Sequence, residues 1–179
     1  MPQPTSRGER IYFAYSPLID PATFDDWKRK NGYPSFQLPE GEVAEAVDMD
    51  LVYDYSSPRW GGRIAGLTKK PGRSVFGRLY RIRAEDWPII QHAEGGRGDK
   101  FAEIAVAVRA GGKQVQAVAF STHPNRATTK GPVSESYAKA LATAAERARL
   151  PAEYAARLRA EAEILQKVQA YGKQHGLES

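Results

Sequence analysis

The chain of 179 residues contains no cysteine. This absence excludes a disulfide framework, a thiolate metal site and a cysteine nucleophile. The three histidines, His92, His123 and His175, lack the close spacing of metal ligands, so we expect no metal site. No apolar run approaches the roughly 18 residues that a membrane-spanning helix needs. Residues 1–10 also lack the apolar core of a signal peptide, so a cytoplasmic location is the default expectation.

Motifs for phosphate binding and for serine catalysis are missing as well. The glycine runs have neither the GxGxxG nor the GxxxxGK[ST] spacing of phosphate-binding loops. No serine lies in a GxSxG turn, the nucleophile motif of α/β-hydrolases. The sequence therefore favours a function without a nucleotide cofactor and without a serine nucleophile.

The composition is that of one folded domain with a basic surface. Hydrophobic residues make up 41% and aromatic residues 10% of the chain, enough for a core. The net charge of +5 and the pI near 9.4 raise the hypothesis of nucleic-acid binding. The densest basic clusters are only residues 28–30 and 69–70, and no nucleic-acid motif accompanies them. A basic solvated surface, which also suits anionic small molecules, is the preferred interpretation.

The order of the expected elements indicates an α+β protein. Runs rich in β-branched and aromatic residues predict strands at 10–15, 42–55 (one or two strands), 74–82, 101–108 and 114–121. A loop that carries Trp60, followed by a further strand, fills residues 56–67, and Pro71-Gly72 predicts a turn. Capping residues and composition predict helices at 20–31, 86–94, 134–149 and 151–171. Clustered strands followed by clustered helices favour a largely antiparallel sheet or barrel.

The short helix at 86–94 places one glutamate in an unusual position. Residues 85–86 are acidic and Pro88 fits the first turn, so the helix begins there and ends near 95–96, where two glycines follow. Glu94 then lies in the last turn, where the negative end of the helix dipole disfavours a carboxylate. If Glu94 is also buried, its pKa rises and it becomes a usable base. The alternative is an ordinary solvated glutamate.

Four segments, in chain order, resemble the gamma-glutamylcyclotransferase-like family. Residues 12–18 (YFAYSPL) are similar to the family's N-terminal strand and loop, YFAYGSNL. Residues 60–65 (WGGRIA), 71–72 and 75–77 are similar to its Trp-Gly-Gly, Pro-Gly and Val-Trp-Gly series. Residues 93–95 (AEG) stand where the family has its catalytic glutamate before a glycine. Residues 133–137 (VSESY) and 150–154 (LPAEY) are similar to its Pro-Ser and Leu-Pro-x-x-Tyr segments.

The resemblance implies a fold and an activity. The fold is a mixed, mostly antiparallel β-barrel flanked by helices, covering residues 10–158, with a helical C-terminal extension at 159–179. The activity converts a γ-glutamyl amine or peptide, such as glutathione, into 5-oxoproline and a free amine without a cofactor or a metal. The implied partner is this small-molecule substrate, with no nucleic acid or membrane, and the chain is a monomer or homodimer. The apolar stripe of the extension (Ala160, Ile164, Leu165, Val168, Tyr171) is expected to pack on the domain, with a helix–helix partner contact as the alternative.

The resemblance also assigns site residues. Glu94 is the general acid and base, and Tyr137 reaches the substrate or this glutamate, with packing on the barrel as the alternative. Trp60 is expected to be a wall of the cavity or of the core. The glycines at 61–62 allow close approach of either neighbouring backbone or a ligand. The loop that wraps the γ-glutamyl head comprises Tyr12, Phe13, Ala14, Tyr15, Ser16 and Pro17; for Tyr15, packing at the strand end is the alternative.

Several positions depart from the family pattern. Ser16 replaces a glycine, Pro17 offers no N–H group, and Leu18 stands where an amide side chain is expected. Phe101 and Gln91 replace a tyrosine and an aspartate that the family often has near the catalytic glutamate. The second hypothesis is therefore a catalytically altered or inactive small-molecule binding module on the same fold.

Overall fold

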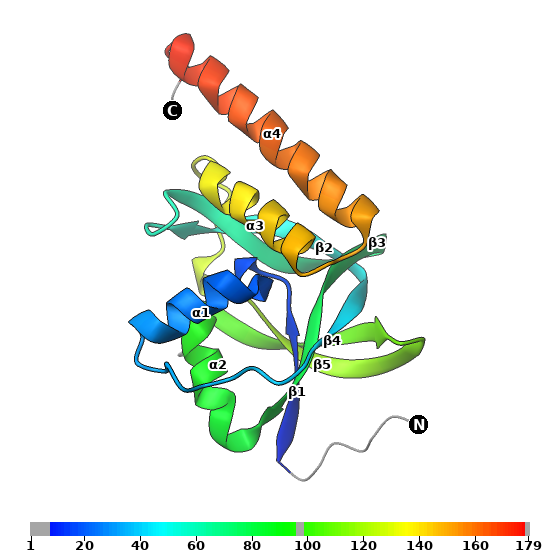
Figure 1. Cartoon of the computed structure of the whole chain (residues 1–179). Helices are drawn as coiled ribbons and strands as arrows, with labels where there is room; N and C mark the ends of the chain where they lie inside the picture. Colours follow the sequence, from blue (N-terminus) through cyan, green and yellow to red (C-terminus); the bar gives the residue numbers. More distant parts are fainter. Residues whose placement is uncertain (1–7, 96–98, 178–179) are drawn as a thin grey trace.

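A computed structural model of the chain describes residues 8–95 and 99–177. Within these residues five strands form a closed barrel in the order β1-β3-β2-β4-β5, and helices surround it (Figure 1). The strands pair antiparallel except β1 with β5, which are parallel. The strands are β1 (Glu9–Ala14), β2 (Glu42–Ser57), β3 (Gly62–Arg83), β4 (Phe101–Ala110) and β5 (Lys113–Thr122). The helices are α1 (Pro21–Lys30), α2 (Trp87–Ala93), α3 (Glu135–Arg147) and α4 (Ala152–Gln174), with 3-10 turns η1 (Pro17–Ile19), η2 (Ala84–Asp86) and η3 (Pro124–Arg126). The predicted α+β class with a mostly antiparallel sheet is confirmed.

The long hairpin of β2 and β3 differs from the sequence prediction. The segments predicted as separate strands on either side of Pro71-Gly72 belong to one strand, β3. Its register against β2 shifts around Asp48, which adopts a positive φ of 56°. The Asp48 carboxylate accepts a hydrogen bond from the Gly72 N–H at 2.9 Å. Pairing with β2 stops at Lys69 and resumes at Ser74, so the predicted turn is present as an unpaired bulge of residues 70–73, and β3 continues past it.

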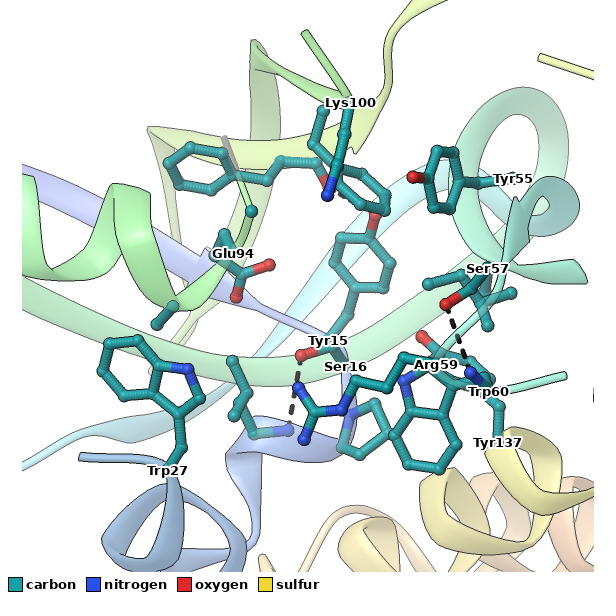
Figure 2. Close-up of a pocket in the computed structure, with 18 of the residues that line it drawn as sticks. Tyr15, Ser16, Trp27, Tyr55, Ser57, Arg59, Trp60, Glu94, Lys100 and Tyr137 are labelled. Carbon is teal, nitrogen blue, oxygen red and sulfur yellow. Dashed lines mark hydrogen bonds between the residues drawn. The ribbon is translucent and has the colours of Figure 1, made fainter. Parts of the chain in front are cut away.

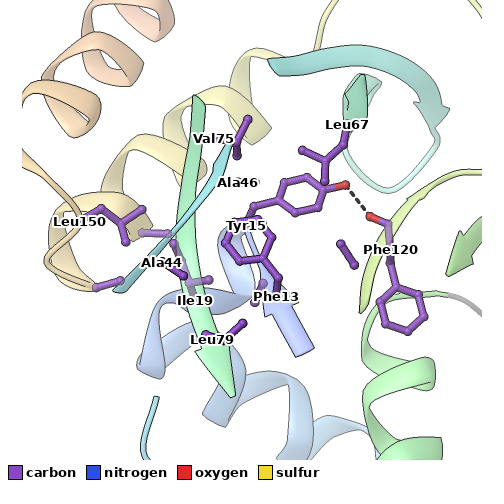
Figure 3. Close-up of a cluster of buried hydrophobic side chains, with 14 of the residues drawn as sticks. Phe13, Tyr15, Ile19, Ala44, Ala46, Leu67, Val75, Leu79, Phe120 and Leu150 are labelled. Carbon is purple, nitrogen blue, oxygen red and sulfur yellow. Dashed lines mark hydrogen bonds between the residues drawn. The ribbon is translucent and has the colours of Figure 1, made fainter. Parts of the chain in front are cut away.

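The core lies inside the barrel and centres on β1. Phe13 is fully buried and Ala14 nearly so, and Val75 of β3 and Phe120 of β5 lie in the same hydrophobic cluster (Figure 3). Gly77 faces β1 so closely that a Cβ atom there would lie 2.1 Å from the Ala14 carbonyl oxygen. A glycine is required at this position because any side chain would separate the two strands.

The segment after β1 is fixed by a buried aspartate. As predicted, Asp20 caps α1, and its carboxylate accepts a hydrogen bond from the Ala22 N–H at 3.1 Å. The same carboxylate pairs with Arg147 of α3 at 3.1 Å. Because η1 lies between β1 and α1, these contacts hold the loop over the barrel end.

Helix α4 extends beyond the rest of the molecule (Figure 1). Its first turns pack on the core through Tyr154 and Leu158. Ile164, Val168 and Tyr171 are 62%, 61% and 58% exposed, and Ala160 is exposed as well. The prediction that the stripe packs on the domain is therefore wrong for these four residues, and Leu165 is only partly buried. The predicted domain boundary at 158–159 falls inside this continuous helix and stays a prediction. Among the described helices, none is long and apolar enough to cross a membrane.

Candidate active site

A cavity of about 420 Å³ opens at one end of the barrel (Figure 2). Its walls come from the β1–η1 loop, α1, the end of β2 with the turn that follows it, the start of β3, the end of α2, the start of β4, β5 and α3. Seven of the 20 lining residues are aromatic: Tyr15, Trp27, Tyr55, Trp60, Phe101, Phe120 and Tyr137. The cavity therefore has the aromatic lining and the few polar groups that are typical of small-molecule sites.

Glu94 is the carboxylate in this lining. It follows α2 directly, where its N–H donates to the Ile90 carbonyl at 3.0 Å, and Gly95 next to it has a φ of +65°. The helix therefore ends where the sequence predicts, although Glu94 is the cap and not part of the last turn. Burial raises the pKa of Glu94 from its usual 4.5 to about 7. Its side chain is half-buried and remains accessible from the cavity.

Tyr12 holds one oxygen of this carboxylate. Its hydroxyl group donates a hydrogen bond to Glu94 Oε1, and this bond partly offsets the effect of burial on the pKa of Glu94. The Tyr12 ring is buried, with the rings of Tyr80 and Trp87 at 6.0 and 6.2 Å between centroids. Burial, followed by the charge of Glu94, raises the pKa of Tyr12 well above its usual value of 10. Tyr12 is therefore a fixed, neutral donor that leaves Glu94 Oε2 for a ligand.

The loop after β1 divides between core and cavity. Tyr15, Ser16 and Pro17 line the cavity, whereas Phe13 and Ala14 point into the core. The Tyr15 hydroxyl donates to the Phe120 carbonyl, so it is already occupied. Tyr15 therefore packs at the end of the strand and also lines the cavity, so it combines the two alternatives that the sequence left open, packing and substrate binding.

Tyr137 likewise packs on the barrel and lines the cavity. Its ring meets the Trp60 ring edge-on at 5.4 Å and the Tyr53 ring at 6.1 Å. Burial raises the pKa of Tyr137 well above 10, so its hydroxyl stays protonated. Of the two glycines after Trp60, Gly62 packs against backbone, since a Cβ there would lie 2.8 Å from the Ser134 nitrogen.

His92 is not part of the cavity lining. It is half-buried on α2, with its Nδ1 3.1 Å from the Tyr33 hydroxyl and its ring against Trp27. Within the described segments, no cluster of three or more His, Asp or Glu side chains is arranged to hold a metal ion.

Two cationic residues of the lining are missed by sequence reasoning, Arg59 and Lys100. Neither has an ion-pair partner within 4.0 Å among residues 8–95 and 99–177. Arg59 directly precedes the WGG motif at residues 60–62, and this neighbouring motif is the sequence signal from which a place for Arg59 near the site could have been predicted. Lys100 carries no comparable signal, because it precedes β4 in a polar, glycine-rich stretch.

Comparisons with known proteins agree with this geometry. Residues 74–158 match the model of the AIG2-like family. The predicted resemblance is therefore confirmed. A search of curated proteins finds no match.

Three solved structures share the gamma-glutamylcyclotransferase-like fold with this chain. An uncharacterized human protein is 25% identical, with a TM-score of 0.68, over 85% of this chain and 87% of its own. A gamma-glutamyl cyclotransferase is 22% identical, with a TM-score of 0.68, over 89% and 99%. A yeast gamma-glutamyl cyclotransferase specific to glutathione is 12% identical, with a TM-score of 0.62, over 89% and 96%. At these identities the last two establish the fold alone.

Proposed function

We propose that the protein is a cofactor-independent gamma-glutamylcyclotransferase with Glu94 as the general acid and base. The observation that supports this most strongly is the carboxylate of Glu94, half-buried in an aromatic cavity and held through one oxygen by Tyr12. The substrate is a γ-glutamyl amine or peptide, and the products are 5-oxoproline and the released amine.

The raised pKa of Glu94 suits the first proton transfer. An α-amino group has a pKa near 8, so at neutral pH it is mostly an unreactive ammonium. Transfer of its proton to a carboxylate with a pKa of about 7 costs about 1.4 kcal/mol. Transfer to a carboxylate at the usual 4.5 would cost about 5 kcal/mol, so burial of Glu94 removes about 3 kcal/mol from this step.

Ring closure then balances within the substrate. Glu94 accepts one proton from the α-ammonium, and the freed amine attacks the γ-carbonyl carbon. The new C–N bond closes the lactam ring, and the C–N bond to the leaving amine breaks as that nitrogen is protonated. Of the three ammonium protons, one stays on the lactam nitrogen and two leave with the amine, which departs as its ammonium. Holding amine and carbonyl close together supplies the other large part of the rate.

The predicted loop residues take different roles in this proposal. Tyr12 positions Glu94, while Tyr15, Ser16 and Pro17 form the wall beside which the γ-glutamyl head lies. Phe13 and Ala14 support that wall from the core. Tyr137 closes the far side with its protonated hydroxyl. A cytoplasmic location and the absence of nucleic-acid partners remain predictions from the sequence.

The test is release of 5-oxoproline from γ-glutamyl-alanine, glutathione and γ-glutamyl-ε-lysine. We expect the wild type to act on at least one of them, and Glu94→Gln to lose about 10² to 10⁴ in kcat. Glu40→Gln is the matched control, because it removes the same charge from an exposed residue far from the cavity lining. No release by the wild type from any substrate would refute the proposal.

A binding module is the second candidate function, and the changed loop favours it. Pro17 has no N–H group, and the Leu18 N–H is occupied by the Ser16 hydroxyl at 3.3 Å. A loop short of donors stabilises a developing oxyanion poorly. Binding of γ-glutamyl compounds without turnover, equal in the wild type and in Glu94→Gln, would support this candidate over the enzyme.

A further inference from the structure

We propose that Arg59 binds the α-carboxylate of the γ-glutamyl head, in place of the backbone donors that residues 17–20 do not offer. This inference rests on the proposed function, because it names the group that selects the head of the same substrate. It makes the cavity selective for a free α-amino acid head over heads whose carboxylate is blocked.

The N–H groups after Ser16 are all committed or absent. Pro17 has none, and the Leu18 N–H donates to the Ser16 hydroxyl. The Ile19 N–H donates to the Ser16 carbonyl, and the Asp20 N–H donates to the Pro17 carbonyl, both at 3.1 Å. Residues 17–20 therefore have no N–H group left for an anion, and a carboxylate beside this turn gains a partner from another segment.

Arg59 lies on a turn that is fixed on both sides. The Trp60 N–H donates to the Ser57 hydroxyl at 3.3 Å, and the Trp60 carbonyl accepts from the Ser134 hydroxyl at 2.7 Å. Gly61, with a φ of +67°, closes the turn through its N–H to the Pro58 carbonyl. The turn thus presents Arg59 from a rigid base even though the side chain itself is exposed.

The side chain of Arg59 points to the loop side of the cavity. Figure 2 shows it extending from its turn across the cavity mouth toward Ser16. Its guanidinium carbon lies 5.9 Å from the centre of the Trp60 ring, which restrains the stem without occupying the N–H donors. The nearby Asp26 carboxylate pairs with Lys30 at 2.8 Å and forms no ion pair within 4.0 Å with Arg59.

The charges of the cavity match those of an α-amino acid. Glu94 provides the negative charge of the lining, which suits the α-ammonium group. Arg59 provides planar, forked donors that fit a carboxylate on two oxygens, which a lysine cannot do. Lys100 lies just before β4, in a different wall of the cavity. In this proposal it faces the leaving amine portion of the substrate. The two ends of one α-amino acid head thus meet opposite charges from two loops.

The experiment compares two ligands in the Glu94→Gln background, where turnover does not interfere. The ligands are γ-glutamyl-alanine and the same compound with its α-carboxylate converted to a carboxamide, and calorimetry gives each Kd. With Arg59 present, we expect the carboxylate ligand to bind about 10- to 100-fold more tightly. With Arg59→Gln added, the ratio falls to below about 3-fold, and Arg59→Lys gives a value between these two.

Controls separate a specific contact from general electrostatics. Arg29→Gln removes a positive charge from the exposed face of α1 and should leave both Kd values unchanged. Lys100→Gln removes a charge from the cavity and should alter both ligands by the same factor. Circular dichroism confirms that each variant is folded.

Three outcomes would overturn the assignment of Arg59: a ratio that Arg59→Gln does not change, a ratio that Lys100→Gln changes as much, or no binding of either ligand. The release of 5-oxoproline by the wild type tests the proposed function separately. Turnover combined with an unchanged ratio would therefore refute this inference alone. Discrimination by Arg59 without turnover would refute the enzyme and leave the inference standing.

Discussion

Replacing Glu94 with glutamine should make the protein more stable at alkaline pH while lowering kcat by about 10² to 10⁴. Burial disfavours the ionised form of Glu94, so the folded state pays for a charge that the unfolded state carries in water. Glutamine has nearly the same shape, and its amide oxygen can still accept the Tyr12 hydroxyl. The substitution therefore removes the buried charge and keeps the contact.

The magnitude and the pH range follow from the pKa of Glu94. Below pH 4.5 the side chain is protonated in both states, so wild type and Glu94→Gln should have similar stability. Between 4.5 and about 7 only the unfolded state ionises, so the wild type loses stability as the pH rises. The full shift corresponds to about 3 kcal/mol, and because the cavity admits water we expect about 2 kcal/mol at pH 8.

Urea unfolding at pH values from 4 to 8 measures this difference. The free energy of unfolding of Glu94→Gln, minus that of the wild type, should be near zero at pH 4 and rise to a plateau above about pH 7. The exposed control Glu40→Gln should differ from the wild type by less than about 0.5 kcal/mol at every pH. A difference for Glu94→Gln that stays constant across this range, or a variant less stable than the wild type at pH 8, would refute the reasoning.

Three further substitutions test other parts of the structure. Tyr12→Phe removes a hydrogen bond that lowers the pKa of Glu94, so the acidic limb of the pH profile of kcat/KM should move to higher pH. Activity at pH 7 should fall several-fold, and an acidic limb that does not move would contradict this prediction. Gly77→Ala places a Cβ 2.1 Å from a β1 carbonyl oxygen and should destabilise the fold by about 3 kcal/mol in urea unfolding; a cost below 1 kcal/mol would show that the strands adjust. Asp20→Asn keeps an acceptor for the α1 cap and loses the pair with Arg147, whose side chain is 60% exposed, and the weak bond from the Thr23 hydroxyl, so it should cost about 1 kcal/mol. Asp20→Ala also loses the cap and should cost about 1 kcal/mol more in urea unfolding; equal costs would place the stabilisation in the ion pair.

The sequence predicts most of the elements because each carries its own local signal. Asp20 and Pro21 mark the start of α1, and the glycines at 111–112, with φ values of +56° and +76°, form the turn between β4 and β5. The position of Glu94 at the end of a short helix also follows from its neighbours. What surrounds it does not, because Tyr12 is 82 residues away and meets it only once β1 has joined the barrel.

Errors arise where pairing or packing partners outweigh local signals. Pro71-Gly72 has the composition of a strand end, but Lys69 before it and Ser74 after it both pair with β2, so β3 continues past the bulge. The stripe at Ile164, Val168 and Tyr171 has the spacing of a buried face, but α4 extends past the elements that would cover it. The spacing of hydrophobic residues shows which face of a helix would be buried, and only the tertiary structure determines whether another element covers that face.

The same distinction applies to the departures in the loop after β1. In the sequence alone, Pro17 and Leu18 each remove a polar group from the segment that the resemblance assigns to binding of the γ-glutamyl head. In the folded molecule the segment next to that loop in space is the turn that carries Arg59, about 40 residues further along the chain. A guanidinium can replace several N–H donors at once, and it brings a full charge to an aromatic cavity. On the proposed function, recognition of the head therefore moves from one loop to another while Glu94 and its pKa stay in place.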